Sequence, residues 1–195
     1  MESTFAVAER LTTRQRQLVD ELVDLFLTEG FTQLTLDEVA ARLGCSKRTL
    51  YALADSKEQL AVRAVRFFFK RSTDQVESAI ARTRSPASRV TRYLEAVAAA
   101  LRPAGPEFRR DLAATAATRE VYEQNTAAAA VRVRQLIDEG IEAGAFRNVS
   151  APFVGEVVTA TMRRITSGEI GRTTGLDDAQ AYAQLARLVV AAVRR

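Results

Sequence analysis

The sequence predicts an all-α protein of about nine helices, and three observations support this prediction. Apolar residues recur at helical spacing, whereas few β-branched residues alternate with polar ones as they would in strands. Several stretches carry a Ser or Thr followed three residues later by Glu or Gln, the spacing of a helix-capping box. The 195 residues are 47% hydrophobic and include 9 Gly and only 4 Pro, a composition typical of a folded, mostly helical chain.

Residues 1–56 predict a small N-terminal domain of three helices, preceded by a loose arm at residues 1–10. Thr12 and Gln15 have capping-box spacing and begin the first helix, which ends at Gly30. The inner face of this helix carries Leu18, Leu22, Leu25 and Phe26.

The second and third helices are short and lie close together in the sequence. Thr35 and Glu38 form a second possible capping box. The apolar face that follows consists of Leu36, Val39, Ala40 and Leu43. Gly44 stands where a left-handed cap residue belongs, and Ser46 can cap the next helix. Two helices that meet at a Gly-containing turn suit the major groove of DNA when the second is polar and basic.

The third helix is expected to present four polar or basic side chains to solvent, Lys47, Arg48, Thr49 and Tyr51. A solvated helix usually mixes acidic with basic residues, but no acid occurs between Glu38 and Asp55. We therefore favour DNA recognition over the alternative, an ordinary helical hairpin within a core.

Residues 57–195 predict a larger helical domain. Ser56 and Gln59 form a third possible capping box, which opens a long helix to about Thr83 that connects the two domains. Five further helices are predicted at residues 86–101, 107–123, 127–143, 150–165 and 178–194. A polar link is expected at residues 171–175.

Charge and composition limit the classes of function. The formal net charge is +4, but residues 1–60 carry seven bases and ten acids. The evidence for DNA binding must therefore come from where the basic side chains lie, and not from the net charge of this region. No secretory signal or run of membrane-spanning length is evident, and a single Cys excludes an internal disulfide. With no His and one Cys, we expect no metal and no cofactor, and a cytoplasmic protein that does not contact membranes.

Spaced residues in the first third of the chain match a known family: Gly30, Phe31, Thr35, Leu36, Val39, Ala40, Leu43, Gly44, Ser46, Thr49, Leu50, Tyr51, Ser56, Lys57, Glu58 and Leu60. This pattern resembles the DNA-binding head of the tetracycline-repressor (TetR) family of bacterial transcriptional regulators, and residues 137–147 add a weaker match in the body. The resemblance implies an all-helical homodimer with a DNA-binding head and an effector cavity in each subunit.

The resemblance also implies seven DNA-contacting residues: Thr35, Ser46, Lys47, Arg48, Thr49, Tyr51 and Lys57. Residues 47–49 lie where family members touch base edges and nearby backbone, whereas Thr35, Tyr51 and Lys57 lie where they contact phosphates. For the three hydroxyl-bearing Ser and Thr residues, plain helix capping is the alternative. For Lys47, Arg48 and Tyr51, the alternative is an ordinary solvent-exposed helix face that does not contact DNA.

The chain departs from the family just after Tyr51. Family members usually carry an aromatic pair where this chain has Leu53 and Ala54. The missing ring removes ~2 kcal/mol or more of packing, and Leu53 is expected to turn inward and compensate in part.

The last two helices carry apolar stripes that predict a dimer interface of four helices, two from each subunit. The candidate interface residues are Val157, Thr161, Leu185, Leu188, Val189 and Ala192. Internal core is the alternative for about half of the positions in these stripes. DNA recognition requires a dimer, because two recognition helices ~34 Å apart can read a palindrome.

A cavity for an unidentified small-molecule effector is expected within residues 60–165. Its candidate lining residues are Phe68, Tyr93, Phe108, Tyr122 and Met162, although aromatics at helical spacing are more often simple core. We expect an uncharged, largely apolar or aromatic effector, unless one of four arginines points inward. These are Arg92, Arg109, Arg119 and Arg163.

Together these features predict a TetR-type transcriptional repressor that binds a palindromic double-stranded DNA operator as a homodimer and is released by its effector. The alternative is a helical ligand-binding protein of the same fold with lost or weak DNA binding. We do not expect an enzyme, because no nucleophile–base pair, phosphate loop or metal-ligand spacing is present. Cys45 offers a redox switch in the turn, but small apolar filler is the simpler interpretation.

Overall fold

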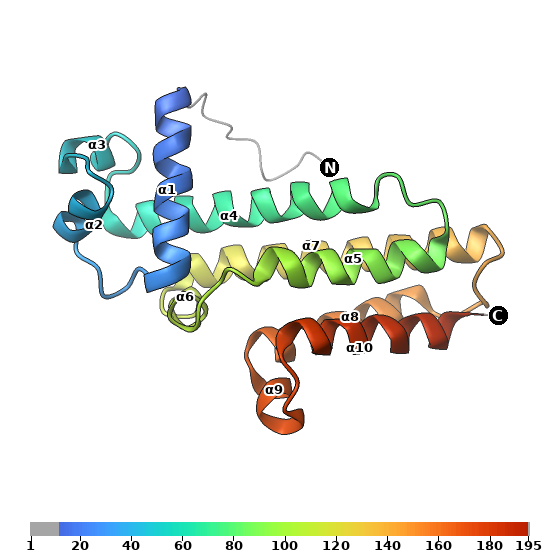
Figure 1. The fold of residues 1–195 in the computed structure, drawn as a ribbon. Coiled ribbons are helices and arrows are strands. Elements are labelled where there is room, and N and C mark those ends of the chain that lie inside the picture. Colours follow the sequence, from blue (N-terminus) through green and yellow to red (C-terminus); the bar gives the residue numbers. More distant parts are fainter. Residues whose placement is uncertain (1–11, 195) are drawn as a thin grey trace.

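The computed structural model describes residues 12–194, and within this range it contains ten α-helices and no strand, which confirms the all-α prediction (Figure 1). The predicted arm at residues 1–10 lies outside the described residues. The helices are α1 (Thr13–Glu29), α2 (Leu36–Arg42), α3 (Lys47–Tyr51), α4 (Lys57–Ile80), α5 (Pro86–Leu101), α6 (Pro106–Leu112), α7 (Ala116–Glu142), α8 (Ala151–Thr166), α9 (Glu169–Thr174) and α10 (Asp178–Val193).

The helices are arranged as a small head, α1–α3, attached to a body of longer helices (Figure 1). α4 starts beside α2 and α3 and runs the length of the body. In the body, α5 packs against α4 and α10, and α7 packs against α4, α5 and α8. The short helix α6 packs against α1, so the head also rests on the body at a second place.

The capping residues begin the helices of the head as predicted. Thr12 and Thr35 each form a complete capping box with Gln15 and Glu38. Ser56 caps α4 through the backbone N–H of Gln59, but the Gln59 side chain accepts from the backbone N–H of Asp55 instead of Ser56, so this third box is only half formed.

Two predicted features of the body are wrong. The break expected between residues 123 and 127 does not exist, because α7 is continuous and begins after Thr115, whose hydroxyl accepts from the backbone N–H of Thr118. The link expected at residues 171–175 is largely helical: α9 forms between Gly168 and Gly175, which both adopt left-handed conformations that end a helix sharply.

The contact between head and body is built around the buried carboxylate of Asp111, near the end of α6. Its Oδ2 atom accepts from the backbone N–H of Phe31 at 2.7 Å and from that of Thr32 at 2.8 Å, in the loop that joins α1 to α2. Gly30 permits this contact, because it has a φ of 76° and a Cβ there would lie 2.7 Å from Asp111 Oδ2. The backbone N–H of Gly105 adds a bond of 2.8 Å to the carbonyl of Leu27.

Aromatic rings fill the space around this carboxylate. Phe31 of the head packs edge-on against Phe108 of α6, with ring centroids 6.0 Å apart, and Phe108 packs edge-on against Phe68 of α4 at 5.4 Å. One apolar cluster therefore runs from α1 through α6 into α4 and reaches Val121 on α7. The proposed domain boundary at residue 56 stays a prediction, since this cluster extends on both sides of it.

Asp111→Ala should lower the free energy of unfolding by about 2–4 kcal/mol, because the buried backbone N–H of Phe31 and the partly buried N–H of Thr32 lose their acceptor. Urea denaturation followed by circular dichroism measures this change. Asp74→Ala, which removes an exposed carboxylate from α4, is the control and should shift stability by no more than about 0.5 kcal/mol. Equal effects of the two substitutions would show that the Asp111 contact does not stabilise the fold.

Candidate functional site

The helix α3 is short, and one buried side chain anchors it to the head. Leu50 is only 1% exposed, whereas Lys47 and Arg48 are exposed and Tyr51 is 50% exposed. Gly44, with a φ of 58°, makes the turn from α2, and Ser46 caps α3 through the backbone N–H of Thr49. The turn therefore holds α3 so that its polar side chains face solvent.

The hydroxyl groups predicted to contact DNA are engaged in helix caps. Ser46 Oγ lies 2.9 Å from Thr49 Oγ1, and the Thr35 hydroxyl donates to Glu38 Oε2 at 2.8 Å. Hydrogen bonds from the backbone N–H and hydroxyl of Thr35 lower the pKa of Glu38, so this carboxylate stays ionised at the start of α2. The capping interpretation therefore holds for all three residues in the structure, and their contact with DNA stays a prediction.

The two lysines of the candidate DNA interface have partners within the head, which sequence reasoning missed. Lys47 Nζ lies 2.7 Å from Asp37 Oδ2, and this hydrogen bond raises the pKa of Lys47. Lys57 Nζ donates to the carbonyl of Thr32 at 2.6 Å. The Arg48 guanidinium, in contrast, forms no hydrogen bond or ion pair with any residue in the described range 12–194. Its contact with DNA stays a prediction, as for the other residues of α3.

The departure from the family pattern after Tyr51 is accommodated within the head. Leu53 is 2% exposed and lies in the same apolar cluster as Leu50, as predicted. Ala54 is half-buried against this cluster. The half-buried Cys45 also packs there, and its pKa is raised by burial and then by the charge of Glu21, which opposes formation of a reactive thiolate.

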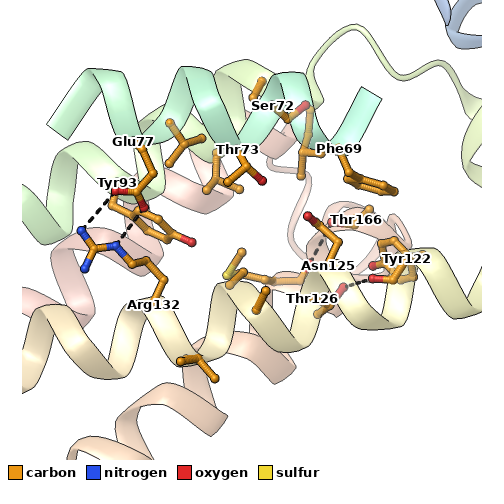
Figure 2. Close-up of a pocket in the computed structure, with 18 of the residues that line it drawn as sticks. Phe69, Ser72, Thr73, Glu77, Tyr93, Tyr122, Asn125, Thr126, Arg132 and Thr166 are labelled. Carbon is orange, nitrogen blue, oxygen red and sulfur yellow. Dashed lines mark hydrogen bonds and ion pairs between the residues drawn. The ribbon is translucent and has the colours of Figure 1, made fainter. Parts of the chain in front are cut away.

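A cavity of about 270 Å³ lies in the body, bordered by α4, α5, α7, α8 and α10. Figure 2 shows Ser72, Thr73 and Glu77 of α4 on one side and Asn125, Thr126 and Arg132 of α7 on the other. Apolar side chains form much of the remaining wall: Phe69, Val76, Val97, Leu101, Ala129 and Met162.

The structure places three of the five predicted cavity residues in this wall and two elsewhere. Tyr93, Tyr122 and Met162 line the cavity. Phe68 and Phe108 do not, because they pack against each other where head and body meet, and they border only a smaller space of about 20 Å³.

One arginine of the cavity wall, Arg132, was not among the four that we considered from sequence. Arg132 forms two bonds to Glu77, Nε to Oε1 at 2.8 Å and Nη2 to Oε2 at 3.1 Å (Figure 2). Of the four, only Arg163 lines the cavity, and it is exposed. Residues 125, 128, 129, 132 and 135 form one face of a continuous α7, so the helix break expected at this point concealed them.

The predicted dimer residues divide into two groups. Leu185 and Val189 are 4% and 5% exposed and belong to the core of the subunit, which is the alternative given for about half of these positions. Val157 and Leu188 are 42% and 66% exposed, Ala192 is exposed and Thr161 is half-buried. Phe153 on α8, 68% exposed, extends this apolar surface, although it was not among the six candidate interface residues.

Within residues 12–194, no helix combines the length and the apolar character needed to cross a membrane. The same range holds no group of three or more His, Cys, Asp or Glu side chains placed to bind a metal ion.

An exposed helix-turn-helix, joined by one long helix to a helical body with a cavity, defines an all-helical, DNA-binding type of transcriptional regulator. Residues 18–64 match the family model described as "Bacterial regulatory proteins, tetR family". This match confirms the resemblance to the TetR family that was recognised from the sequence.

Solved structures show that the fold extends over the rest of the chain. A TetR regulator from Chloroflexus aurantiacus matches with a TM-score of 0.74 and 20% identity, over 92% of this chain and 95% of that one. A putative regulator from Saccharomonospora viridis in complex with choline matches with a TM-score of 0.76 and 15% identity, over 92% and 97%. FadR from Bacillus subtilis in complex with stearoyl-CoA matches with a TM-score of 0.72 and 13% identity, over 90% and 97%. No protein among those with curated functions matches the sequence.

Proposed function

We propose that the protein is a cytoplasmic, non-enzymatic transcriptional repressor that binds a palindromic operator as a homodimer and is released by a small-molecule effector. The observation that carries this proposal is that α4 belongs both to the support of the helix-turn-helix and to the wall of the cavity. Its first turn supports the helix-turn-helix, and residues 69–77 form a wall of the cavity. An occupant of the cavity can therefore act on the position of α3.

DNA recognition in this proposal depends on α3. Arg48 is exposed and can form the two parallel bonds by which Arg reads guanine in the major groove. Lys47 and Lys57 would contact phosphates after exchanging Asp37 and the Thr32 carbonyl for DNA oxygens, and Tyr51 would donate its hydroxyl to the backbone.

Dimerisation would use the exposed apolar side chains of α8 and α10. Phe153, Val157 and Leu188 are large, and each exposes two fifths or more of its surface. A two-fold axis that pairs these helices with their copies would bury all three in a four-helix interface. The same symmetry would present both α3 helices to one face of a duplex.

Release would follow from a shift between two arrangements of α4. A chain of contacting rings, Phe69, Phe68, Phe108 and Phe31, leads from the cavity wall to the loop held by Asp111. An effector that binds better to a dimer with changed α3 spacing would shift the equilibrium from the DNA-binding arrangement to the released one. A change in the ratio of released to DNA-binding dimers from 1:99 to 99:1 requires the effector to bind the released form about 5.5 kcal/mol more tightly. Two proteins of similar fold are in complex with choline and with stearoyl-CoA, which supports the binding of small molecules by this fold.

A second candidate is a ligand-binding protein of this fold with weak or lost DNA binding. The internal partners of Lys47 and Lys57, together with the acidic excess in residues 1–60, favour it. This second candidate has the same ligand cavity but would not bind a specific operator sequence.

Selection of bound fragments from random DNA distinguishes the two candidates. The full chain should enrich an inverted repeat whose half-site centres lie one or more helical turns apart, with ~34 Å for a single turn. Recovery of unenriched sequences would support the second candidate. Recovery of a single, non-repeated site would contradict the dimeric arrangement.

Arg48→Ala should weaken binding to the selected operator by ~1–3 kcal/mol and relax the preference at one base pair in each half-site. Fluorescence anisotropy with operator and scrambled duplexes at fixed salt measures both effects. Arg66→Ala, at an exposed position of α4 in the body, is the matched control and should leave both affinities unchanged. An equal loss of affinity for both duplexes would show that Arg48 contacts only the DNA backbone.

Leu188→Glu should convert the dimer to a monomer, because it would place an unpaired carboxylate in the proposed interface at a cost of about 3–5 kcal/mol. Analytical ultracentrifugation measures the change. Ala99→Glu adds the same group at an exposed site on α5 and should leave the assembly unchanged. A Leu188→Glu protein that remains dimeric would place the interface elsewhere.

A further inference from the structure

The charged groups around the cavity largely neutralise one another. Arg132 is bonded to both oxygens of Glu77 and also lies 3.4 Å from Glu139, which in turn pairs with Arg89. An anionic ligand would have to displace Glu77 to reach Arg132, and a cationic ligand would have to displace Arg132. Arg163 is solvated at its exposed position and offers little binding energy to an anion.

A buried hydroxyl at the opposite end of the cavity has no partner. Tyr182 of α10 is 1% exposed, and its hydroxyl oxygen forms no hydrogen bond with any residue in the described range. Thr166 is nearby, but its hydroxyl donates to the carbonyl of Met162 at 3.0 Å and is not in bonding geometry with Tyr182. An unpaired buried hydroxyl is costly, so this position favours a ligand that pairs with it.

The Tyr182 hydroxyl can serve as a hydrogen-bond donor under ordinary conditions. Burial raises the pKa of Tyr182 to about 12, and the neighbouring Thr166 hydroxyl offsets part of the rise. The phenol therefore keeps its proton at neutral pH and requires an acceptor atom.

The position of Tyr182 connects ligand binding to the head. Tyr182 lines both the main cavity and the smaller space that Phe108 borders. The ring of Phe108, which packs on Phe31 of the head, therefore borders the same small space as Tyr182. Tyr93, whose hydroxyl points into the cavity from its other side in Figure 2, offers a second donor near Glu77.

We infer that the effector is an uncharged, mostly apolar small molecule whose carbonyl-type oxygen accepts a hydrogen bond from the Tyr182 hydroxyl. This inference rests on the proposed function, in which the cavity is the effector site. The cavity of about 270 Å³ suits a compact molecule, such as an aromatic or alicyclic ketone, ester or amide. Its chemistry differs from the charged groups of choline and stearoyl-CoA, which the two relatives in fold bind.

Four probes of similar size test the inference: 4-phenyl-2-butanone, n-butylbenzene, 3-phenylpropionate and 3-phenylpropylammonium. Isothermal titration calorimetry on the full chain should rank the ketone first, about tenfold or more above the carboxylate and the ammonium ion. The chain has no Trp, and three of its 4 Tyr line the cavity, so tyrosine fluorescence gives an independent signal of binding there. Tighter binding of either ion, or no binding by any of the four, would overturn the inference.

Tyr182→Phe keeps the ring and removes only the hydroxyl. It should lower affinity for the ketone about tenfold and change affinity for butylbenzene by less than about twofold. The variant without ligand should also melt at the same temperature as the wild type or higher, because it lacks the unpaired hydroxyl. Arg66→Ala, at an exposed position of α4 outside the cavity wall, is the control and should bind all four probes as the wild type does.

The outcomes separate this inference from the proposed function. Unchanged ketone affinity in Tyr182→Phe, or a clear fall in its melting temperature, would overturn the role of the hydroxyl while leaving operator selection intact. Failure of operator selection with a retained ketone preference would overturn the repressor proposal and leave the cavity chemistry standing.

Discussion

The arrangement of head and body depends on one buried carboxylate. Asp111 accepts two backbone N–H groups from the loop between α1 and α2, and that loop has few other polar contacts with the body. A hydrogen bond to backbone depends on the position of the chain and not on the side chains of the head. The contact therefore holds the head in one orientation through its main chain, while the rings of Phe31, Phe108 and Phe68 exclude water from it.

This junction also explains how two distant sites share one helix. α4 is braced near its middle, where Phe68 and Phe69 belong to the cluster of the head, and beyond that point it borders the cavity. A displacement at residues 69–77 cannot be absorbed by a flexible linker, because the helix runs without interruption from Lys57 to Ile80. In the proposed mechanism, the stiffness of α4 transmits the change, and the contacts of α6 determine where the helix pivots.

Local signals in the sequence predicted the head well and the cavity poorly. The helix starts at Thr12, Thr35 and Ser46 follow from side chains that bond to backbone three residues away, so a short window contains the whole interaction. The hydrogen bond from the backbone N–H of Phe31 to the Asp111 carboxylate joins residues 80 positions apart, and no local sequence pattern predicts it. The continuity of α7 was missed for a related reason, because the polar run near Asn125 resembles a helix end until the packing of α7 against α4 is known.

The internal pairing of the lysines has a consequence for the proposed repressor. Each lysine that reaches a phosphate must first leave Asp37 or the Thr32 carbonyl, so the gain from charge neutralisation is reduced by the contact given up. The excess of acids in residues 1–60 reduces non-specific attraction further. Binding would then depend mainly on simultaneous engagement of two Arg48 side chains at the correct separation. If the affinity for DNA depends more on the spacing of the two heads than on charge, a small change in that spacing is enough to release the protein. A rigid α4 can transmit such a change from the cavity to the head.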